Sequence, residues 1–169
     1  MDGKTRQRSD FQLTLPSDRE IRLTRTFNAP RDLVWIATTD ARHVRRWWSC
    51  EEFELTVCEI DLRIGGRFRF TMQGPDGIAH PITGVYREIV RPQRVIHTQV
   101  YDVAPYADRE AIVTVTFDED NGRTRYTSTI LHQTRGDRDA HVASGMETGS
   151  AAALDRLADL LPTLETTQI

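Results

Sequence analysis

Polar side chains that could carry chemistry recur in the stretch RVIHTQVY, residues 94–101. A period of two puts His97 and Gln99 on one face of a strand, together with Tyr101. If this face is turned inward, an imidazole and an amide lie in an apolar interior, where polar groups need hydrogen-bond partners. A ligand could supply these partners. Neighbouring strands or water could supply them equally well if the face is partly exposed.

Two further side chains could take part in acid–base chemistry. Tyr86 and Glu88 alternate with Gly84 in HPITGVYREIV. An inward Tyr86 could hold a carbonyl or a phenol by its hydroxyl, and burial could raise the pKa of Glu88 enough for general acid or base catalysis. The alternative for Glu88 is a surface carboxylate paired with an arginine. The candidate catalytic residues are therefore Tyr86, Glu88 and His97.

Ser128 shares a strand face with Tyr126 and Ile130, so it could line the same interior space. A nucleophilic serine needs a base within hydrogen-bond reach, and His97 is the candidate for that base. The chain has no GxSxG elbow, however. Serine catalysis is therefore disfavoured.

Nothing in the sequence indicates a metal or cofactor site. The chain has five histidines: His43, His80, His97, His132 and His141. None stands at a standard zinc spacing from another histidine, a cysteine or a carboxylate. The Gly65-Gly66 pair lacks the following helix of a phosphate-binding loop, so it is interpreted as a turn. We expect no metal and no cofactor.

Three arginines and two adjacent tryptophans stand together in ARHVRRWWSC, residues 41–50. Such a pattern could bind nucleic acid or could end a helix whose aromatic rings close a cavity. Trp47 and Trp48 follow Val44 at helical spacing, which favours the second interpretation. The net charge of −3 also disfavours nucleic acid, because such binding draws most of its affinity from neutralised phosphates. The arginines then form a solvated rim that could steer an acidic ligand.

The length of 169 residues favours one domain. The two cysteines, Cys50 and Cys58, do not form a CxxC motif, and free thiols in a reducing compartment are expected. No apolar run reaches the roughly 20 residues of a membrane span, and the first residues lack the apolar core of a secretory signal. We therefore expect a cytoplasmic protein that does not enter a membrane.

The periodicity predicts an α+β fold. In chain order it predicts a polar tail over 1–20 with a short strand at FQLTL, a strand over 21–27, two short helices within 28–48, about six strands over 53–132 and a long helix over 137–161. A curved antiparallel sheet can wrap around the long C-terminal helix and bury its apolar stripe. The two short helices then close the end that the long helix leaves open.

Six segments in this order resemble one known superfamily. They are FNAPRDLVW, DARHVRRWW, DLRIGGRFRF, GVYREIVRPQRV, VTVTF and GMETGSAAALDRLADLL. Over residues 21–161 the chain is similar to the START-like, or SRPBCC, superfamily with its helix-grip fold. It resembles more closely the branch named after the activator of heat-shock-protein-90 ATPase. The resemblance implies one START-like domain over 21–162, with a short C-terminal tail over 163–169.

The chain departs from the pattern of this branch in two places. The final helix of the branch commonly carries a tryptophan after the glycine that corresponds to Gly149, where this chain has Ser150. Removing an indole from a core position leaves a cavity or a repacked core. The face of RVIHTQVY is commonly aromatic or aliphatic, whereas here it carries two polar side chains.

Members of the superfamily bind varied apolar ligands, act as cyclases or have no known activity. The resemblance therefore implies a binding protein for a small apolar or aromatic ligand, held between the long helix and the sheet. The expected lining consists of Trp35, Trp48, Phe68, Phe70, Tyr86, His97, Gln99, Tyr101, Ser128, Met146 and Ser150. The alternatives are a polyketide cyclase/aromatase-like enzyme and a chaperone-associated stress-response interaction domain. A homodimer is left open, and no nucleic-acid partner is expected.

Overall fold

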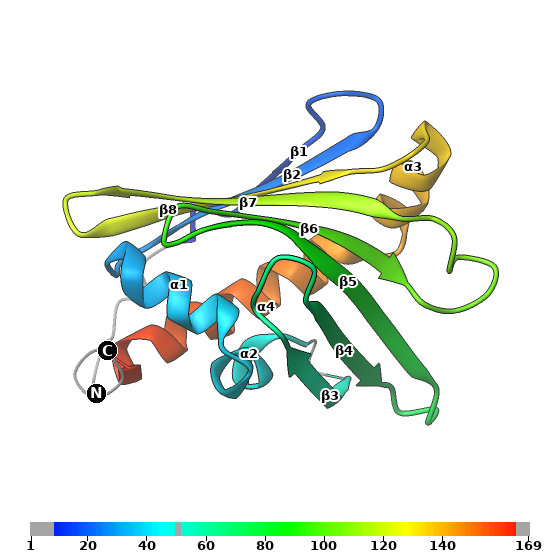
Figure 1. Ribbon diagram of the computed structural model, residues 1–169, viewed down its shortest axis with the longest axis horizontal. Coiled ribbons are helices and arrows are strands. Elements are labelled where there is room, and N and C mark those ends of the chain that lie inside the picture. Colours follow the sequence, from blue (N-terminus) through cyan, green and yellow to red (C-terminus); the bar gives the residue numbers. More distant parts are fainter. Residues whose placement is uncertain (1–8, 50–51, 165–169) are drawn as a thin grey trace.

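An antiparallel sheet of eight strands forms most of the computed structural model, which describes residues 9–49 and 52–164 (Figure 1). The strands are β1 (Gln12–Thr14), β2 (Glu20–Phe27), β3 (Glu54–Ile60), β4 (Arg67–Gln73), β5 (Ala79–Val90), β6 (Arg94–Tyr101), β7 (Ala111–Asp120) and β8 (Arg123–Leu131). Their order across the sheet is β1-β2-β8-β7-β6-β5-β4-β3. The six-strand meander predicted for 53–132 is confirmed, and β1 is the short strand expected at FQLTL.

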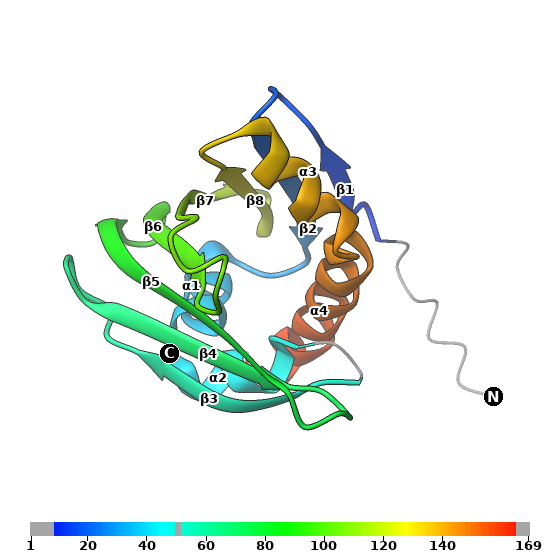
Figure 2. The ribbon, with the colours of Figure 1, turned by 90° about the vertical axis from the view of Figure 1, so that its right-hand side faces the viewer.

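The sheet is curved, and the long C-terminal helix lies across its open side. Figure 2 shows the strands bending from β1 and β2 round to β3, with α4 opposite the concave face. Two register shifts help the sheet to bend, one between Leu55 and Val57 in β3 and one between Tyr86 and Glu88 in β5. The helix-grip arrangement expected from the sequence is therefore confirmed.

Two short helices follow β2, as the sequence predicts. They are α1 (Arg31–Thr39) and α2 (Ala41–Trp47). Asp40 separates them, because its extended backbone ends α1 and its carboxylate accepts a hydrogen bond from the backbone N–H of Arg42 at the start of α2. Both helices turn apolar side chains, among them Leu33, Val34 and Val44, into the interior.

The C-terminal helix is broken, which corrects the prediction of one continuous helix over 137–161. It consists of α3 (Arg135–Ala143) and α4 (Met146–Leu160), and a short 3-10 helix, η1 (Leu161–Leu164), follows. Gly145 between them has a left-handed backbone with φ of 85°. Glycine adopts this conformation without a steric penalty, so the chain changes direction there. Of these two helices, α4 is the one that lies opposite the concave face of the sheet (Figure 2).

Buried apolar side chains form two separate clusters. The large cluster joins α1, α2, the C-terminal half of α4 and η1 to the sheet, and its members include Leu33, Val34, Val44, Phe68, Val95, Phe117, Leu154 and Leu157. The small cluster lies near α3 and consists of Ile21, Leu23, Ala111, Val113 and Ile130. Between the two clusters, the inner face of the sheet carries three of the predicted site residues, His97, Gln99 and Ser128.

Candidate ligand-binding site

The inner face of β6 changes from apolar to polar between the two clusters. Val95 is buried in the large cluster. His97, the next residue on the same face, is only half-buried and pairs across the ladder with Val113 of the small cluster. Gln99 follows on that face and is also half-buried. His97 and Gln99 therefore lie at the border between the two apolar clusters, where the inner face is only half-buried.

Ser128 occupies the corresponding place on β8. It is buried and lies between Tyr126, which packs against the large cluster, and Ile130 of the small cluster. Burial raises the pKa of Tyr126 to about 12, so its phenol is uncharged at neutral pH. Among the described residues, Ser128 makes no hydrogen bond to His97, whose Nδ1 is bonded elsewhere. The geometry therefore gives no support to a serine nucleophile with a histidine base.

The apolar contacts of helix α4 are also interrupted between the two clusters. Met146 packs against the small cluster, whereas Ala153 packs against the large one. Ser150 and Gly149 lie between these two contacts on the same helical stripe and are half-buried. We call the residues between the clusters the seam: His97, Gln99 and Ser128 on the sheet, Gly149 and Ser150 on α4.

Aromatic rings hold His97 in place. Its ring meets Phe68 edge-on with ring centroids 4.9 Å apart, and Tyr86 edge-on at 6.0 Å. Nδ1 lies 2.8 Å from the carbonyl oxygen of Thr98. Burial lowers the pKa of His97, and the hydrogen bond to Thr98 opposes that shift by less. His97 is therefore a neutral, oriented imidazole at neutral pH.

Tyr86 lies on the inner face of β5, directly across the ladder from His97. The side chain is buried in the large cluster. Burial raises the pKa of its phenol well above the ordinary value, with smaller contributions from Cys58 and Asp61. Tyr86 is therefore a hydrogen-bond donor and is not available as a base.

Glu88 does not share the inner face with Tyr86, which corrects the alternation expected from the sequence. The register shift between these two residues pairs Glu88 with Ile96 on the outer face. Its carboxylate lies 2.6 Å from Arg94, and this hydrogen bond lowers the pKa of Glu88. The surface glutamate paired with an arginine is the arrangement observed, so Glu88 is withdrawn as an acid or base of the site.

Tyr101 ends the polar face of β6. Its hydroxyl lies 2.7 Å from Nδ1 of His80, and the two rings are stacked with centroids 5.9 Å apart. Phe53 meets His80 edge-on. Both members of the His80–Tyr101 pair are half-buried, so this end of the inner face stays accessible to solvent.

The three tryptophans have different environments. Trp35 is 1% exposed and packs edge-on against Phe117, so it belongs to the solid part of the core. Trp47 is buried and donates its indole N–H to the carbonyl of Ala37 at 2.9 Å. Trp48 is half-buried, with its ring 4.8 Å from that of Phe70. Of the three, Trp48 alone is only half-buried.

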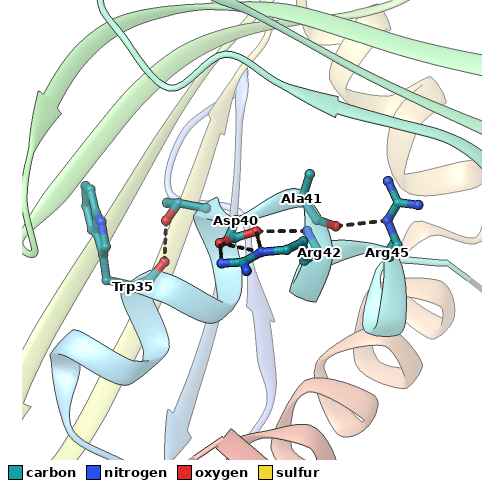
Figure 3. Close-up of polar contacts among 6 residues, drawn as sticks. Trp35, Asp40, Ala41, Arg42 and Arg45 are labelled. Atoms are coloured by element: carbon teal, nitrogen blue, oxygen red, sulfur yellow. Dashed lines mark hydrogen bonds and ion pairs between the residues drawn. The ribbon is translucent and has the colours of Figure 1, made fainter. Parts of the chain in front are cut away.

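The arginines beside these tryptophans are exposed, as the rim interpretation predicts. Arg42 folds back onto Asp40, with Nη2 2.7 Å from a carboxylate oxygen (Figure 3). Arg45 donates to the carbonyls of Ala41 and Cys58. Arg42 and Arg45 thus form hydrogen bonds to groups of α2, the residue before it and β3.

Sequence reasoning missed Arg25 as a member of the inner face. Its side chain is 8% exposed, forms an ion pair with Asp155 of α4, and lies over the ring of Phe27 at 5.4 Å. The signal was present, because Arg25 occupies an apolar position in the alternation of Ile21, Leu23 and Phe27. This arginine joins α4 to β2.

A second missed contact joins α3 to the sheet. Nε2 of His132, just after β8, lies 2.9 Å from Nδ1 of His141 in α3. Burial lowers the pKa of both rings, and burial together with the neighbouring His132 lowers the pKa of His141 to about 4. The two histidines are nine positions apart in the sequence, and no helical or strand period connects them.

Surface hollows occur outside the seam. One of about 360 Å³ lies where α1 meets α2 and the β3–β4 turn. Another of about 320 Å³ lies beside β3 and Arg45. Of the predicted lining residues, Trp35 alone faces either of these hollows. Within residues 9–49 and 52–164, no three histidine, cysteine, aspartate or glutamate side chains gather as metal ligands, and no helix is long and apolar enough to cross a membrane.

A curved sheet that grips a C-terminal helix, with two short helices after its first long strand and a mixed polar and aromatic inner face, defines a START-like, or SRPBCC, protein. The sequence model of the activator of Hsp90 ATPase homolog 1-like proteins matches residues 28–162. The chain belongs to this family. No curated protein matches the sequence.

Solved structures with the same fold cover almost the whole chain. A protein of Rhodobacter sphaeroides has a TM-score of 0.84 at 27% identity, over 92% of this chain and 100% of that one. A protein of Nitrosomonas europaea has a TM-score of 0.80 at 25% identity, over 90% and 100%. CalU16 of Micromonospora echinospora has a TM-score of 0.63 at 25% identity, over 92% and 87%.

Proposed function

We propose that this chain binds a small apolar or aromatic ligand between α4 and the concave face of the sheet. The proposal is supported because the large apolar side chains are interrupted both on the sheet and on α4, between the same two clusters. The sheet carries the half-buried polar side chains of His97 and Gln99, and α4 presents only small side chains at Gly149 and Ser150, between the same two clusters. Small side chains on α4 opposite a half-buried polar stretch of the sheet would leave room for a ligand there.

The surroundings of the seam suit an apolar or aromatic guest. Phe68, Phe70 and Trp48 form a continuous aromatic wall, with ring centroids 4.8 and 5.0 Å apart. Met146 adds a flexible side chain from α4. Apolar walls with a few fixed polar groups are the usual composition of small-molecule sites, where the walls provide affinity and the polar groups orient the ligand.

The test is to refill the seam. In Ser150→Trp, an indole would occupy the space opposite His97, and we expect wild-type protein but not this variant to be stabilised by a panel of naphthalene and anthracene derivatives in thermal-shift measurements. Thr148→Trp is the matched control, because Thr148 is exposed on the same helix. It should bind as wild type does. Equal binding by Ser150→Trp and wild type, or no binding by wild type, contradicts the proposal.

A polyketide cyclase/aromatase-like enzyme is the alternative at the same place. The pairing of Tyr86 with His97 supports it, because a protonated phenol and a neutral imidazole are a donor and an acceptor on one inner surface. Turnover of a linear polyketide substrate by wild type, lost in Tyr86→Phe and His97→Gln with the fold retained, would establish it. Absence of turnover leaves the binding proposal in place.

The remaining expectations stay predictions. A chaperone-associated stress-response role rests on the family name, and copurification with chaperone from lysate tests it. A homodimer is tested by light scattering.

The buried, free thiol of Cys58 supports a reducing, cytoplasmic location, whereas Cys50 lies outside the described residues. The START-like domain boundaries at 21 and 162 are tested by limited proteolysis.

A further inference from the structure

His97 presents only one of its two ring nitrogens to the seam. Nδ1 lies 2.8 Å from the carbonyl oxygen of Thr98. A carbonyl oxygen can only accept, so Nδ1 must carry the proton of this hydrogen bond. In a neutral imidazole the other nitrogen, Nε2, then has a lone pair and no proton.

Nε2 is free to meet a ligand. Among the described residues, no protein group bonds to it. The buried side-chain atoms there without a partner are others: Arg25 Nε, His43 Nε2, Thr71 Oγ1 and Arg156 Nη2. Since Nε2 of His97 is neither bonded nor among these, solvent reaches it. A half-buried acceptor that is open to solvent can receive a ligand's hydrogen bond without first breaking a protein contact.

The packing around the ring fixes this orientation. A Cβ at Gly84 would overlap both the carbonyl oxygen of Thr98 and the ring of Phe68. The glycine therefore lets these two groups lie where one accepts the Nδ1 proton and the other supports the imidazole edge-on. Tyr86 flanks the ring across the ladder. The tautomer and the direction of Nε2 are consequently built into the sheet.

An anion is disfavoured at Nε2 itself. Arg25 on the inner face of β2 is paired with Asp155, and Arg156 of α4 donates to the hydroxyl of Ser49, although each keeps one buried nitrogen without a partner among the described residues. A carboxylate brought to Nε2 would place two lone-pair acceptors against each other with no proton between them. A hydroxyl or phenol instead supplies the missing proton.

We propose that the seam selects ligands whose polar end is an uncharged hydrogen-bond donor, an alcohol or a phenol, and that Nε2 of His97 accepts this hydrogen bond. This inference rests on the proposed function and names the chemical class of its ligand. His97 is thus the residue that determines the specificity for the polar end of the ligand, while the aromatic wall holds the remainder.

The test compares three probes that share one apolar body: 2-naphthol, 2-methoxynaphthalene and 2-naphthoate. With wild type at pH 7.5 we expect 2-naphthol to bind on the order of fivefold tighter than 2-methoxynaphthalene, the gain of one net hydrogen bond. The naphthoate should be the weakest. Binding of none of the three contradicts the proposed function, whereas equal binding of all three, or preference for the carboxylate, overturns the present inference alone.

Two variants separate the hydrogen bond from the packing. His97→Phe should bind 2-methoxynaphthalene as wild type does and lose the preference for 2-naphthol. His97→Gln should keep part of the preference, because its amide oxygen also accepts. A preference for 2-naphthol that survives in a folded His97→Phe overturns the inference.

Measurements on the wild-type protein test the inference without any substitution. Long-range 15N–1H NMR spectra should show His97 protonated at Nδ1, and its Nε2 resonance should move on addition of 2-naphthol but not of 2-methoxynaphthalene. Lowering the pH through the depressed pKa of His97 should abolish the preference for 2-naphthol over 2-methoxynaphthalene, since a protonated Nε2 donates and no longer accepts. A ring protonated at Nε2, or selectivity that does not change when the ring titrates, overturns the inference.

Discussion

The two halves of α4 differ in the size and burial of their side chains. Leu154, Leu157 and Leu160 in the C-terminal half are buried in the large cluster. In the N-terminal half, the run from Met146 to Ala153 contains no fully buried side chain. One continuous helix therefore presents large buried side chains at one end and small, half-buried side chains at the other. Large side chains bury more apolar area than small ones, so the C-terminal half contributes more to stability.

The inner face of the sheet also has a buried apolar part and a half-buried polar part. Phe68 and Val95 are buried in the large cluster, whereas His97 and Gln99, farther along the same inner surface, are half-buried and polar. Both α4 and the inner face of the sheet pass from large buried side chains to small or polar half-buried ones. We therefore predict that stability depends on the residues of the large cluster, and ligand contact on the residues of the seam.

The largest expected effect contrasts two substitutions in α4. Leu157 is 0% exposed, so Leu157→Ala removes buried methyl groups and leaves a cavity in the large cluster. We expect a loss of about 3 kcal/mol in the free energy of unfolding. Ser150→Ala in the seam should change it by less than about 0.5 kcal/mol. Urea denaturation measures both, and similar losses would show that the two halves are packed alike.

Acid is expected to loosen the α3 end before the packed end. Because burial and the neighbouring His132 lower the pKa of His141 to about 4, the unfolded chain takes up a proton first as the pH falls below about 6.5. Stability contributed by the neutral pair is therefore lost between pH 6.5 and 4, by about 2 kcal/mol between pH 7 and 5 for this group.

Hydrogen exchange at pH 7 and 5 checks this expectation. Exchange should accelerate in α3 and in the neighbouring ends of β2 and β8, while the amides of α1 and α2 change least. His141→Gln removes the titrating ring, so its stability should fall less over the same pH range. An equal acid response in this variant would assign the effect to other groups.

The smallest expected effect concerns the ion pair where the two halves of α4 meet. Asp155→Asn leaves the buried guanidinium of Arg25 without its counter-charge, but Asp155 itself is 56% exposed and solvent screens the pair. We expect a loss of about 1 kcal/mol in the free energy of unfolding, between the values for exposed pairs and for buried charged hydrogen bonds. The difference from wild type should shrink in 1 M NaCl, and a salt-independent loss would point to packing instead.

Much of the fold could be predicted because it depends on local periodicity. The alternation in residues 53–132 predicts the meander, and Asp40 predicts the start of α2. The broken C-terminal helix was missed, because the small residues around Gly145 continue a helical pattern and glycine alone does not fix where a helix ends. Strand alternation also failed at Glu88, since a register shift is set by pairing with the neighbouring strand.

The sequence predicted which site residues share a strand face, but not the distances and hydrogen bonds between them. His97 and Gln99 share a half-buried inner face as the period of two predicts. The partner of Nδ1 and the open side of Nε2 could not be predicted, because they depend on how closely Phe68 and Thr98 approach a glycine on the adjacent strand. Arg25 could have been found from its place in an apolar alternation.

The sequence by itself determined the order of elements, the family, and the small and polar side chains at Ser150 and His97. Local periodicity and composition are properties of neighbouring residues, so they can be recognised without a structure. What depended on the tertiary structure is that His97 and Ser150 each lie between the contacts to two apolar clusters, that Glu88 points outward, and that His141 meets His132. Such relations depend on strand register and on the distance between layers, which are set by packing across the whole chain.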